Sequence, residues 1–326
     1  MYKIIVDAMG GDNGSSIVVE AAKKFLEDNK DVELTLVGKK EELASLEGTC
    51  RIIDARDIVP MEAGALEVMR LKNSSMMVAI RTCKEENLDA VVSCGSTGGF
   101  LSAATLNFKM IPGIKRAALV GPFPTAIKGK KVVILDVGAS NENSADELVQ
   151  FALLGKLYSQ AVYGVEKPSI YLLSNGSEEG KGSPEVKAAY KMLKESNFEG
   201  FKGNIEARYV LSGDADVVVT DGFTGNIFLK SNEGLAKLMG NLIKSAFKRN
   251  LWSKLGYLHV RKGMKEMSET LDHKTIGGAM LLGINGNVVK AHGNSDAFAF
   301  YHALRVAKKL AEGDVVNKIK EGLENA

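Results

Sequence analysis

The sequence predicts an α/β protein in which a mostly parallel β-sheet carries helices on both faces. Short β-branched runs alternate with longer helical stretches along most of the 326 residues, as in successive β–α–β units. The predicted strands are apolar runs without polar alternation, which is typical of strands that helices cover on both faces. Frequent glycine (34 residues) and rare proline (6 residues) fit many strand-to-helix turns.

The β-branched run KIIVDAM at residues 3–9 predicts the first strand, and the helical pattern over residues 15–29 follows it. Each later strand is predicted where Val, Ile and Leu cluster between glycine or polar residues. These strands span residues 32–38, 50–55, 89–94, 117–123, 131–139, 169–175, 215–221 and 287–293. A short helix is predicted between residues 38 and 50, and longer ones over 73–87, 97–108, 144–162 and 183–196 and from 295 onward.

Composition excludes several classes of protein. Lys plus Arg (42) nearly balance Asp plus Glu (40), so a chain-wide basic field for nucleic acid is ruled out. The cysteines Cys50, Cys83 and Cys94 form no C-x-x-C pair, so neither a zinc ribbon nor a thioredoxin motif is present. The first apolar run ends at Asp7, too short for a signal peptide, and no run approaches 18 apolar residues. We therefore expect a cytoplasmic protein with a single domain over residues 1–326.

Glycine and small polar residues follow several predicted strands, where an α/β sheet binds its ligands. Each of these turns alone is explained by a tight strand-to-helix connection. Their recurrence at the same topological point favours a cleft at one sheet edge, in which helix N-termini accept an anion. The turns are DAMGGD (7–12), SCGSTGG (93–99), DVGAS (136–140), SNGSEEGKG (174–182), DGFTGN (221–226) and AHGNSD (291–296).

Individual side chains in these turns have a functional and a structural interpretation. Lys181 is either a cation for a phosphate or an oxyanion, or a solvated lysine paired with neighbouring glutamates. Asp221 is a helix N-cap or a cleft carboxylate, and Asn226 could donate a hydrogen bond to a carbonyl oxygen. His292 ends a strand beside the predicted site. Cys94 could be a nucleophile, but the pattern favours a small residue that fills space at the end of a strand.

The standard cofactor and nucleophile motifs are missing from the sequence. It contains no G-x-x-x-x-G-K-[ST] loop, no G-x-G-x-x-G after a strand, no G-x-S-x-G and no H-E-x-x-H. We therefore predict no cofactor and no metal site.

The chain resembles the PlsX family, the bacterial phosphate acyltransferases of phospholipid synthesis. It carries, in the family's order, DAMGGD, S-x-G-S-T-G-G, LDVGA, NG-S-E-E-G-K-G, LSGDADVVVTDGFTGNI-x-LK and GGAMLLGINGNVVKAHGNSDA. The resemblance implies a three-layer α/β/α sandwich similar to isocitrate and isopropylmalate dehydrogenases and to phosphotransacetylase. It also implies transfer of a fatty acyl group from acyl carrier protein to inorganic phosphate, homodimers and peripheral membrane attachment. The acyl phosphate product would feed a membrane glycerol-3-phosphate acyltransferase.

Together, the turns and the resemblance define a predicted site. Its catalytic residues are Lys181, Asp221 and Asn226. Its phosphate- and substrate-binding residues are Asp7, Gly10, Gly11, Gly95, Ser96, Thr97, Gly98, Gly225, His292 and Asn294. Phosphate is already an anionic nucleophile and a thioester has a good leaving group, so positioning and oxyanion stabilisation suffice and a direct attack is expected.

Other functions remain open from the sequence. A phosphotransacylase that uses coenzyme A thioesters would have the same fold and chemistry. An oxidative decarboxylase with a nicotinamide cofactor would need acidic metal ligands and arginines, in which these turns are poor. A membrane-bound scaffold without activity would not explain six polar turns.

One helical, basic segment without strands, residues 232–274, interrupts the α/β pattern and predicts a helical hairpin insertion. Its first part has an apolar stripe that suits packing on the core or on a second subunit. Its second part sets Leu251, Trp252, Leu255 and Leu258 among lysines and arginines, with no acidic residue between Lys244 and Lys265. This pattern favours an anionic membrane surface. Docking of an acidic carrier protein is a strong alternative and nucleic acid a weak one.

Overall fold

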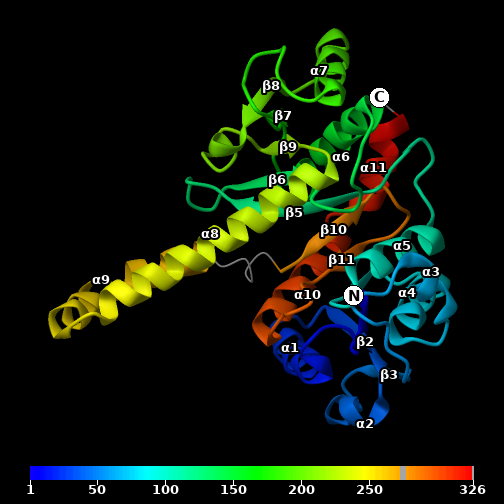
Figure 1. Ribbon diagram of the computed structural model, residues 1–326. Helices are drawn as coiled ribbons and strands as arrows, with labels where there is room; N and C mark the ends of the chain where they lie inside the picture. The colour runs from blue at the N-terminus through cyan, green and yellow to red at the C-terminus, as the bar shows by residue number, and fades with distance from the viewer. Residues whose placement is uncertain (272–276, 325–326) are drawn as a thin grey trace.

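The computed structural model describes residues 1–271 and 277–324 of the chain. In this part of the chain the strands form one 11-stranded sheet, in the order β3-β2-β1-β4-β11-β10-β5-β6-β9-β7-β8 (Figure 1). The strands are β1 (Tyr2–Asp7), β2 (Val32–Gly38), β3 (Arg51–Asp54), β4 (Ala90–Ser93), β5 (Ala118–Pro124), β6 (Lys131–Leu135), β7 (Ile170–Ser174), β8 (Phe201–Glu206), β9 (Val217–Val219), β10 (Ala279–Leu282) and β11 (Val288–Lys290).

Helices connect most of these strands. They are α1 (Gly14–Asp28), α2 (Lys40–Leu43), α3 (Ala65–Arg70), α4 (Ser75–Glu85), α5 (Thr97–Phe108), α6 (Ala145–Tyr163), α7 (Pro184–Glu195), α8 (Gly222–Lys248), α9 (Leu251–Leu271), α10 (Ala297–Glu312) and α11 (Val315–Glu324). The predicted mixed α/β fold with a mostly parallel, helix-covered sheet is confirmed. That the chain is a single domain stays a prediction.

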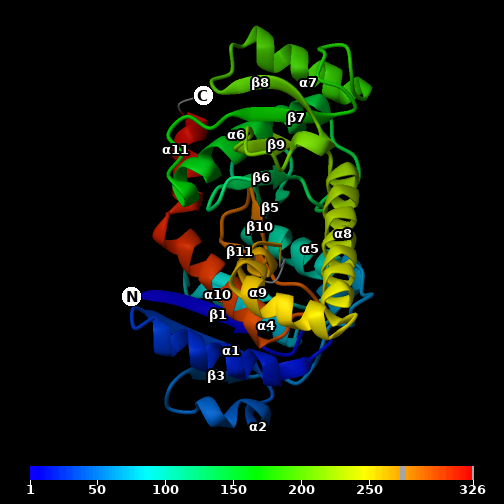
Figure 2. The ribbon, with the colours of Figure 1, turned by 90° about the vertical axis from the view of Figure 1, so that its left-hand side faces the viewer.

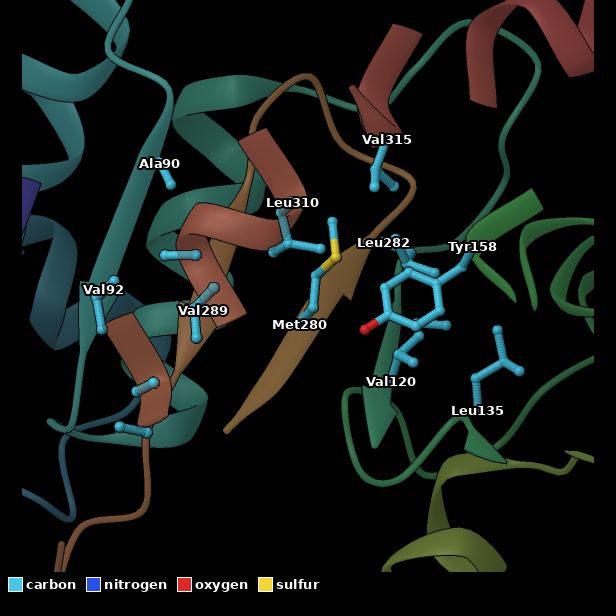
Figure 3. Close-up of a cluster of buried hydrophobic side chains, with 14 of the residues drawn as sticks. Ala90, Val92, Val120, Leu135, Tyr158, Met280, Leu282, Val289, Leu310 and Val315 are labelled. Carbon is cyan, nitrogen blue, oxygen red and sulfur yellow. The ribbon is translucent and has the colours of Figure 1, made fainter. Parts of the chain in front are cut away.

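Alternate residues of each strand pack into different hydrophobic clusters, which gives the fold its three layers. In β1, Ile4 and Val6 join one cluster and Ile5 joins the other. The first cluster lies under α1, α6, α7, α10 and α11. Figure 3 shows its centre, where Tyr158 of α6 and Leu310 of α10 flank Met280 and Leu282 of β10. The second cluster lies under α3, α4, α5 and the start of α8. Burial on both faces explains the apolar strands that the sequence shows.

The sheet contains two parallel blocks that run in opposite directions. β1, β2, β3, β4 and β11 are parallel to one another, and so are β6, β7, β8 and β9. Between the blocks, β10 is antiparallel to both β11 and β5, and β5 is antiparallel to β6. The prediction that all six turns lie at one sheet edge is therefore wrong. The turns after β1, β4 and β11 share one edge, and those after β6, β7 and β9 share the other.

Most element boundaries agree with the sequence prediction, and three elements were missed. The strand at 32–38 and the helix at 97–108 are found as predicted, whereas the strand predicted over 131–139 ends at Leu135. The missed elements are α3, β8 and β10, of which α3 and β10 are short, with six and four residues. β8 is an edge strand with Gly203 and polar residues, which weaken a strand pattern. The single C-terminal helix that was predicted is divided into α10 and α11.

Helices α8 and α9 pack against each other and project from the body of the molecule (Figures 1 and 2). The rings of Phe247 and Tyr257 meet edge to face, with 5.2 Å between their centroids, and close the tip of this pair. We call residues 235–271 of α8 and α9 the arm. Residues 272–274 of the predicted hairpin lie outside the described residues. Among the helices of the described chain, none combines the length and apolarity that crossing a bilayer requires.

Candidate active site

A cavity of about 390 Å³ lies where the two strand blocks meet, between β5, β10, β11 and α8. Its apolar lining residues include Leu119, Pro122, Phe123, Val137 and Leu229. Its polar lining residues include Asp12, Thr97, Asn226, Lys230, Glu233, Lys290, His292 and Asn294. The cavity thus combines residues from turns at both sheet edges, because α8 starts at one edge and reaches the other along this face of the sheet.

A buried carboxylate holds the two glycine turns of the first edge together. Asp7 accepts hydrogen bonds from Ser75 Oγ (2.6 Å), Ser93 Oγ (2.7 Å) and the Met9 amide (3.2 Å). Burial raises its pKa, and these hydrogen bonds oppose the rise. Gly10 packs on Gly95 so closely that a Cβ there would lie 2.7 Å from the Gly95 nitrogen. Asp7, Gly10 and Gly95 therefore hold together the two turns that bring Asp12 and Thr97 to the cavity, and they are not among the described residues that line it.

The turn after β4 presents the N-terminus of α5 to the cavity. Ser96 is buried, caps α5 by accepting a hydrogen bond from the Gly99 amide (3.3 Å), and donates one to the Ala63 carbonyl (3.1 Å). Thr97, the first residue of α5, lines the cavity. The first N–H groups of a helix have no partner within the helix and favour an anion. This end of the cavity is suited to a phosphate group.

Asn226 reaches the cavity because the start of α8 packs tightly on the turn after β6. A Cβ at Gly225 would lie 1.9 Å from the Asp136 carbonyl oxygen, and one at Gly222 would lie 2.0 Å from that of Ser140. Asp136 is fully buried and accepts hydrogen bonds from the amides of Gly138 (3.0 Å) and Ser140 (2.9 Å). Gly138 in turn leaves room for the side-chain amide of Asn226. A Cβ at position 138 would lie 2.6 Å from Asn226 Nδ2.

The other two predicted catalytic residues lie outside the described lining of this cavity. Asp221 caps α8 and accepts a hydrogen bond from the Thr224 amide (2.8 Å). This is the helix N-cap role, the structural one of its two interpretations. Lys181 is exposed in the loop between β7 and α7, where the Gly182 amide donates to Asn175 Oδ1 (3.0 Å). The roles predicted for both residues stay predictions.

His292 lies in the cavity wall beside two charged residues of α8. Its Nε2 atom is 3.5 Å from Lys230 Nζ and 3.8 Å from a Glu233 carboxylate oxygen. Lys230 and Glu233 also form an ion pair at 2.9 Å. His292 and Asn294, which the sequence predicted as binding residues, line the cavity, and their binding role stays a prediction. Lys230 and Glu233 were not predicted.

Lys290 is a cavity residue that the sequence reasoning missed. It ends β11, and only 6% of its surface is exposed. Strand alternation places it on the same face as Val288, whose cluster underlies α5 and α8. Burial lowers the pKa of Lys290 to about 8, although Cys94, Asp7 and Asp12 oppose this effect. A lysine within the apolar run NVVKAHG is the signal that could have revealed it.

Cys94 is buried beneath this site. Its thiol donates to the Gly10 carbonyl (2.8 Å), and burial raises its pKa to about 12. A thiol with so high a pKa is a poor nucleophile at neutral pH, as the structural interpretation of Cys94 predicted.

Known proteins show similarity over nearly the whole chain. The model of a family described as "Fatty acid synthesis protein" matches residues 2–318. A protein named phosphate acyltransferase from an Exiguobacterium species is 42% identical over 324 residues, covering 98% of each chain. The chain belongs to this family, the PlsX phosphate acyltransferases. It is therefore an acyltransferase.

Solved structures confirm the fold class. A phosphotransacetylase from Streptococcus pyogenes superposes with a TM-score of 0.61 at 18% identity, covering 95% of this chain and 94% of its own. A 4-hydroxythreonine-4-phosphate dehydrogenase from Klebsiella pneumoniae gives a TM-score of 0.55 at 13% identity, covering 95% and 99%. At these identities the likeness concerns the fold alone. It agrees with the dehydrogenase-like sandwich expected for this PlsX family member.

Proposed function

We propose that this PlsX family member transfers a fatty acyl group from the thioester of acyl carrier protein to inorganic phosphate. The observation that carries this proposal is the cavity itself, whose lining combines apolar side chains with the N-terminus of α5. The relatives' name, phosphate acyltransferase, supports phosphate as the acceptor. In the proposed complex, phosphate lies near Thr97, and the first carbons of the acyl chain pack against Leu119, Phe123 and Leu229.

The reaction proceeds by direct attack. A phosphate oxygen forms a bond to the acyl carbon, the C–S bond breaks, and sulfur leaves with the proton that the phosphate releases. Asn226 donates a hydrogen bond to the carbonyl oxygen as negative charge develops on it. Burial of Cys94 and its high pKa support a mechanism without an acyl-enzyme.

The donor is proposed to be the carrier protein because the arm carries many cations. Exposed basic residues lie on both helices of the arm and in the turn between them, and they include Lys244, Lys248, Arg249, Lys254, Arg261 and Lys262. Acyl carrier proteins are acidic, so this surface suits their docking. Coenzyme A, itself an anion, remains the alternative donor.

The arm is also proposed to bind a membrane and a second copy of the chain. Leu251, Trp252, Leu255 and Leu258 are exposed at its tip, with 81% of the Trp252 surface accessible. Large apolar groups among cations suit the headgroup layer of an anionic bilayer, where a membrane glycerol-3-phosphate acyltransferase would accept the product. The stripe of Leu235, Leu238, Met239 and Leu242 is exposed as well. A homodimer would cover it.

The proposed reaction is tested by incubating the purified protein with phosphate and either acyl carrier protein thioester or the matching coenzyme A thioester. Acyl phosphate is trapped with hydroxylamine as the hydroxamate, and reactions without phosphate are the control. Faster phosphate-dependent hydroxamate formation from the carrier-protein thioester supports the proposal. Preference for coenzyme A would reassign the donor, and no product from either donor would refute the function.

A further inference from the structure

Lys290 is the buried cation of the cavity. Its Nζ atom donates a hydrogen bond to the Ala291 carbonyl, which leaves two N–H groups of the ammonium for other acceptors. The residue lines the same cavity as Thr97 at the start of α5 and Asn294 after β11. An anion bound at the α5 N-terminus would therefore lie in a cavity that Lys290 also faces.

The charge of Lys290 is incompletely compensated. No carboxylate of the described residues lies within 4.0 Å of its ammonium, and the charged or titratable groups that act on it are Cys94, Asp7, Asp12 and Lys230. Of these, Cys94 and Asp7 are protonated more readily than usual because they are buried. A buried ammonium without a close anion is costly unless a ligand supplies the countercharge.

The other candidate cations differ from Lys290 in these respects. Lys230 lines the cavity, but its side chain is more than half exposed and Glu233 neutralises it at 2.9 Å. Lys181 is exposed and is not among the described residues that line the cavity. Only Lys290, of these three, combines burial with a position in the cavity wall.

We propose that Lys290 is the cation that binds the attacking phosphate. Its two remaining N–H groups donate to phosphate oxygens, and the free backbone N–H groups at the N-terminus of α5 donate to the same anion. This inference rests on the proposed function, since it gives phosphate its place in that reaction. It assigns Lys290 a direct contact with a reactant and moves the phosphate-binding cation from the β7–α7 loop to the end of β11.

The test compares variants in two assays, the phosphate dependence of acyl phosphate formation and the rise in melting temperature with inorganic phosphate. Lys290→Met should raise the phosphate concentration for half-maximal rate roughly 10- to 100-fold, the loss expected for a hydrogen bond to a charged group. Its Michaelis constant for the acyl donor should stay within about threefold of the wild-type value. Phosphate should stabilise the wild type and not this variant. Lys290→Arg, which keeps the cation, should recover part of both effects.

Lys131→Met is the matched control. Lys131 is also a partly buried lysine with a lowered pKa, but it lies at the start of β6 and not in the described cavity lining.

Lys181→Ala tests the rival cation. The proposal is overturned if Lys290→Met keeps the wild-type response to phosphate, or if Lys181→Ala alone loses it. If the wild type makes no acyl phosphate but phosphate still stabilises it through Lys290, the reaction fails and the binding site stands.

Discussion

At the scale of single residues, the burial of the charged Lys290 side chain lowers the stability of the folded protein in the absence of a bound anion. Its pKa is lowered from 10.5 to about 8 by burial. Below about pH 8 the folded protein therefore carries a buried charge that opposes folding. Between about pH 8 and 10.5 the unfolded chain binds the proton that the folded protein has lost, so this penalty disappears as the pH rises.

Lys290→Met should consequently raise the free energy of unfolding at pH 7, by up to roughly 3 kcal/mol. The gain should shrink as the pH rises toward 10.5. Denaturant unfolding of both proteins in phosphate-free buffer at neutral and alkaline pH measures this difference. A variant that is less stable than the wild type at pH 7 would show that Lys290 serves the fold and not a ligand.

Asn226 is the second residue on which the chemistry depends. Loss of one donor to a developing oxyanion costs about 10²–10³ in rate, so Asn226→Ala should lower kcat by this factor at saturating substrates. Asn241→Ala is the control, because Asn241 is exposed on the same helix. A loss below about tenfold in Asn226→Ala would assign the oxyanion to another donor.

At the scale of elements, the start of α8 depends on glycine. A Cβ at Gly225 would clash with the Asp136 carbonyl at 1.9 Å, whereas Gly240 has nothing within 4 Å. Gly225→Ala should destabilise the protein by about 1–3 kcal/mol through overpacking. Gly240→Ala should instead stabilise the helix by about 0.5–1 kcal/mol. Shifts of the denaturation midpoint in opposite directions would verify this packing, and equal shifts would contradict it.

The tip of the arm is the element proposed to meet the membrane. Binding to vesicles should require anionic lipid and weaken with salt, because each Lys or Arg near such a surface contributes about 1 kcal/mol. Trp252→Glu and Leu255→Glu should abolish co-sedimentation while activity in solution is retained. Met192→Glu, a change at an exposed apolar residue of α7, is the control. Unchanged binding by the two arm variants would place the membrane contact elsewhere.

At the scale of the whole molecule, we expect the proposed homodimer to form through the exposed apolar stripe of the arm, Leu235, Leu238, Met239 and Leu242. Sedimentation should show a dimer for the wild type and a smaller species for Leu238→Glu combined with Leu242→Glu. Both leucines are more than half exposed in the isolated chain, so the substitutions should leave its own fold intact. A dimer that persists in the double variant would exclude this stripe as the interface.

The amino-acid sequence by itself determined the alternation of strands and helices, the small-residue turns that follow the strands and the basic arm. These features are local, since β-branched runs, glycines and apolar periodicity each act over a few neighbouring residues. The PlsX motifs likewise identified the family. Ser96, Asn226 and His292 could be selected because their turns are visible in the sequence.

Only the tertiary structure decided which of those turns meet. The short strand β10 enters the sheet antiparallel to β5 and β11, and with β5 it reverses the direction of the second block. Strand direction depends on pairing between distant segments, which no local pattern records. This reversal places the turn that carries Lys181 at the opposite sheet edge from the turns after β1, β4 and β11, and α8 carries Asn226 into the cavity that they share. Burial of Lys290 has the same origin, because β4 and β10 flank β11 only when the sheet is assembled.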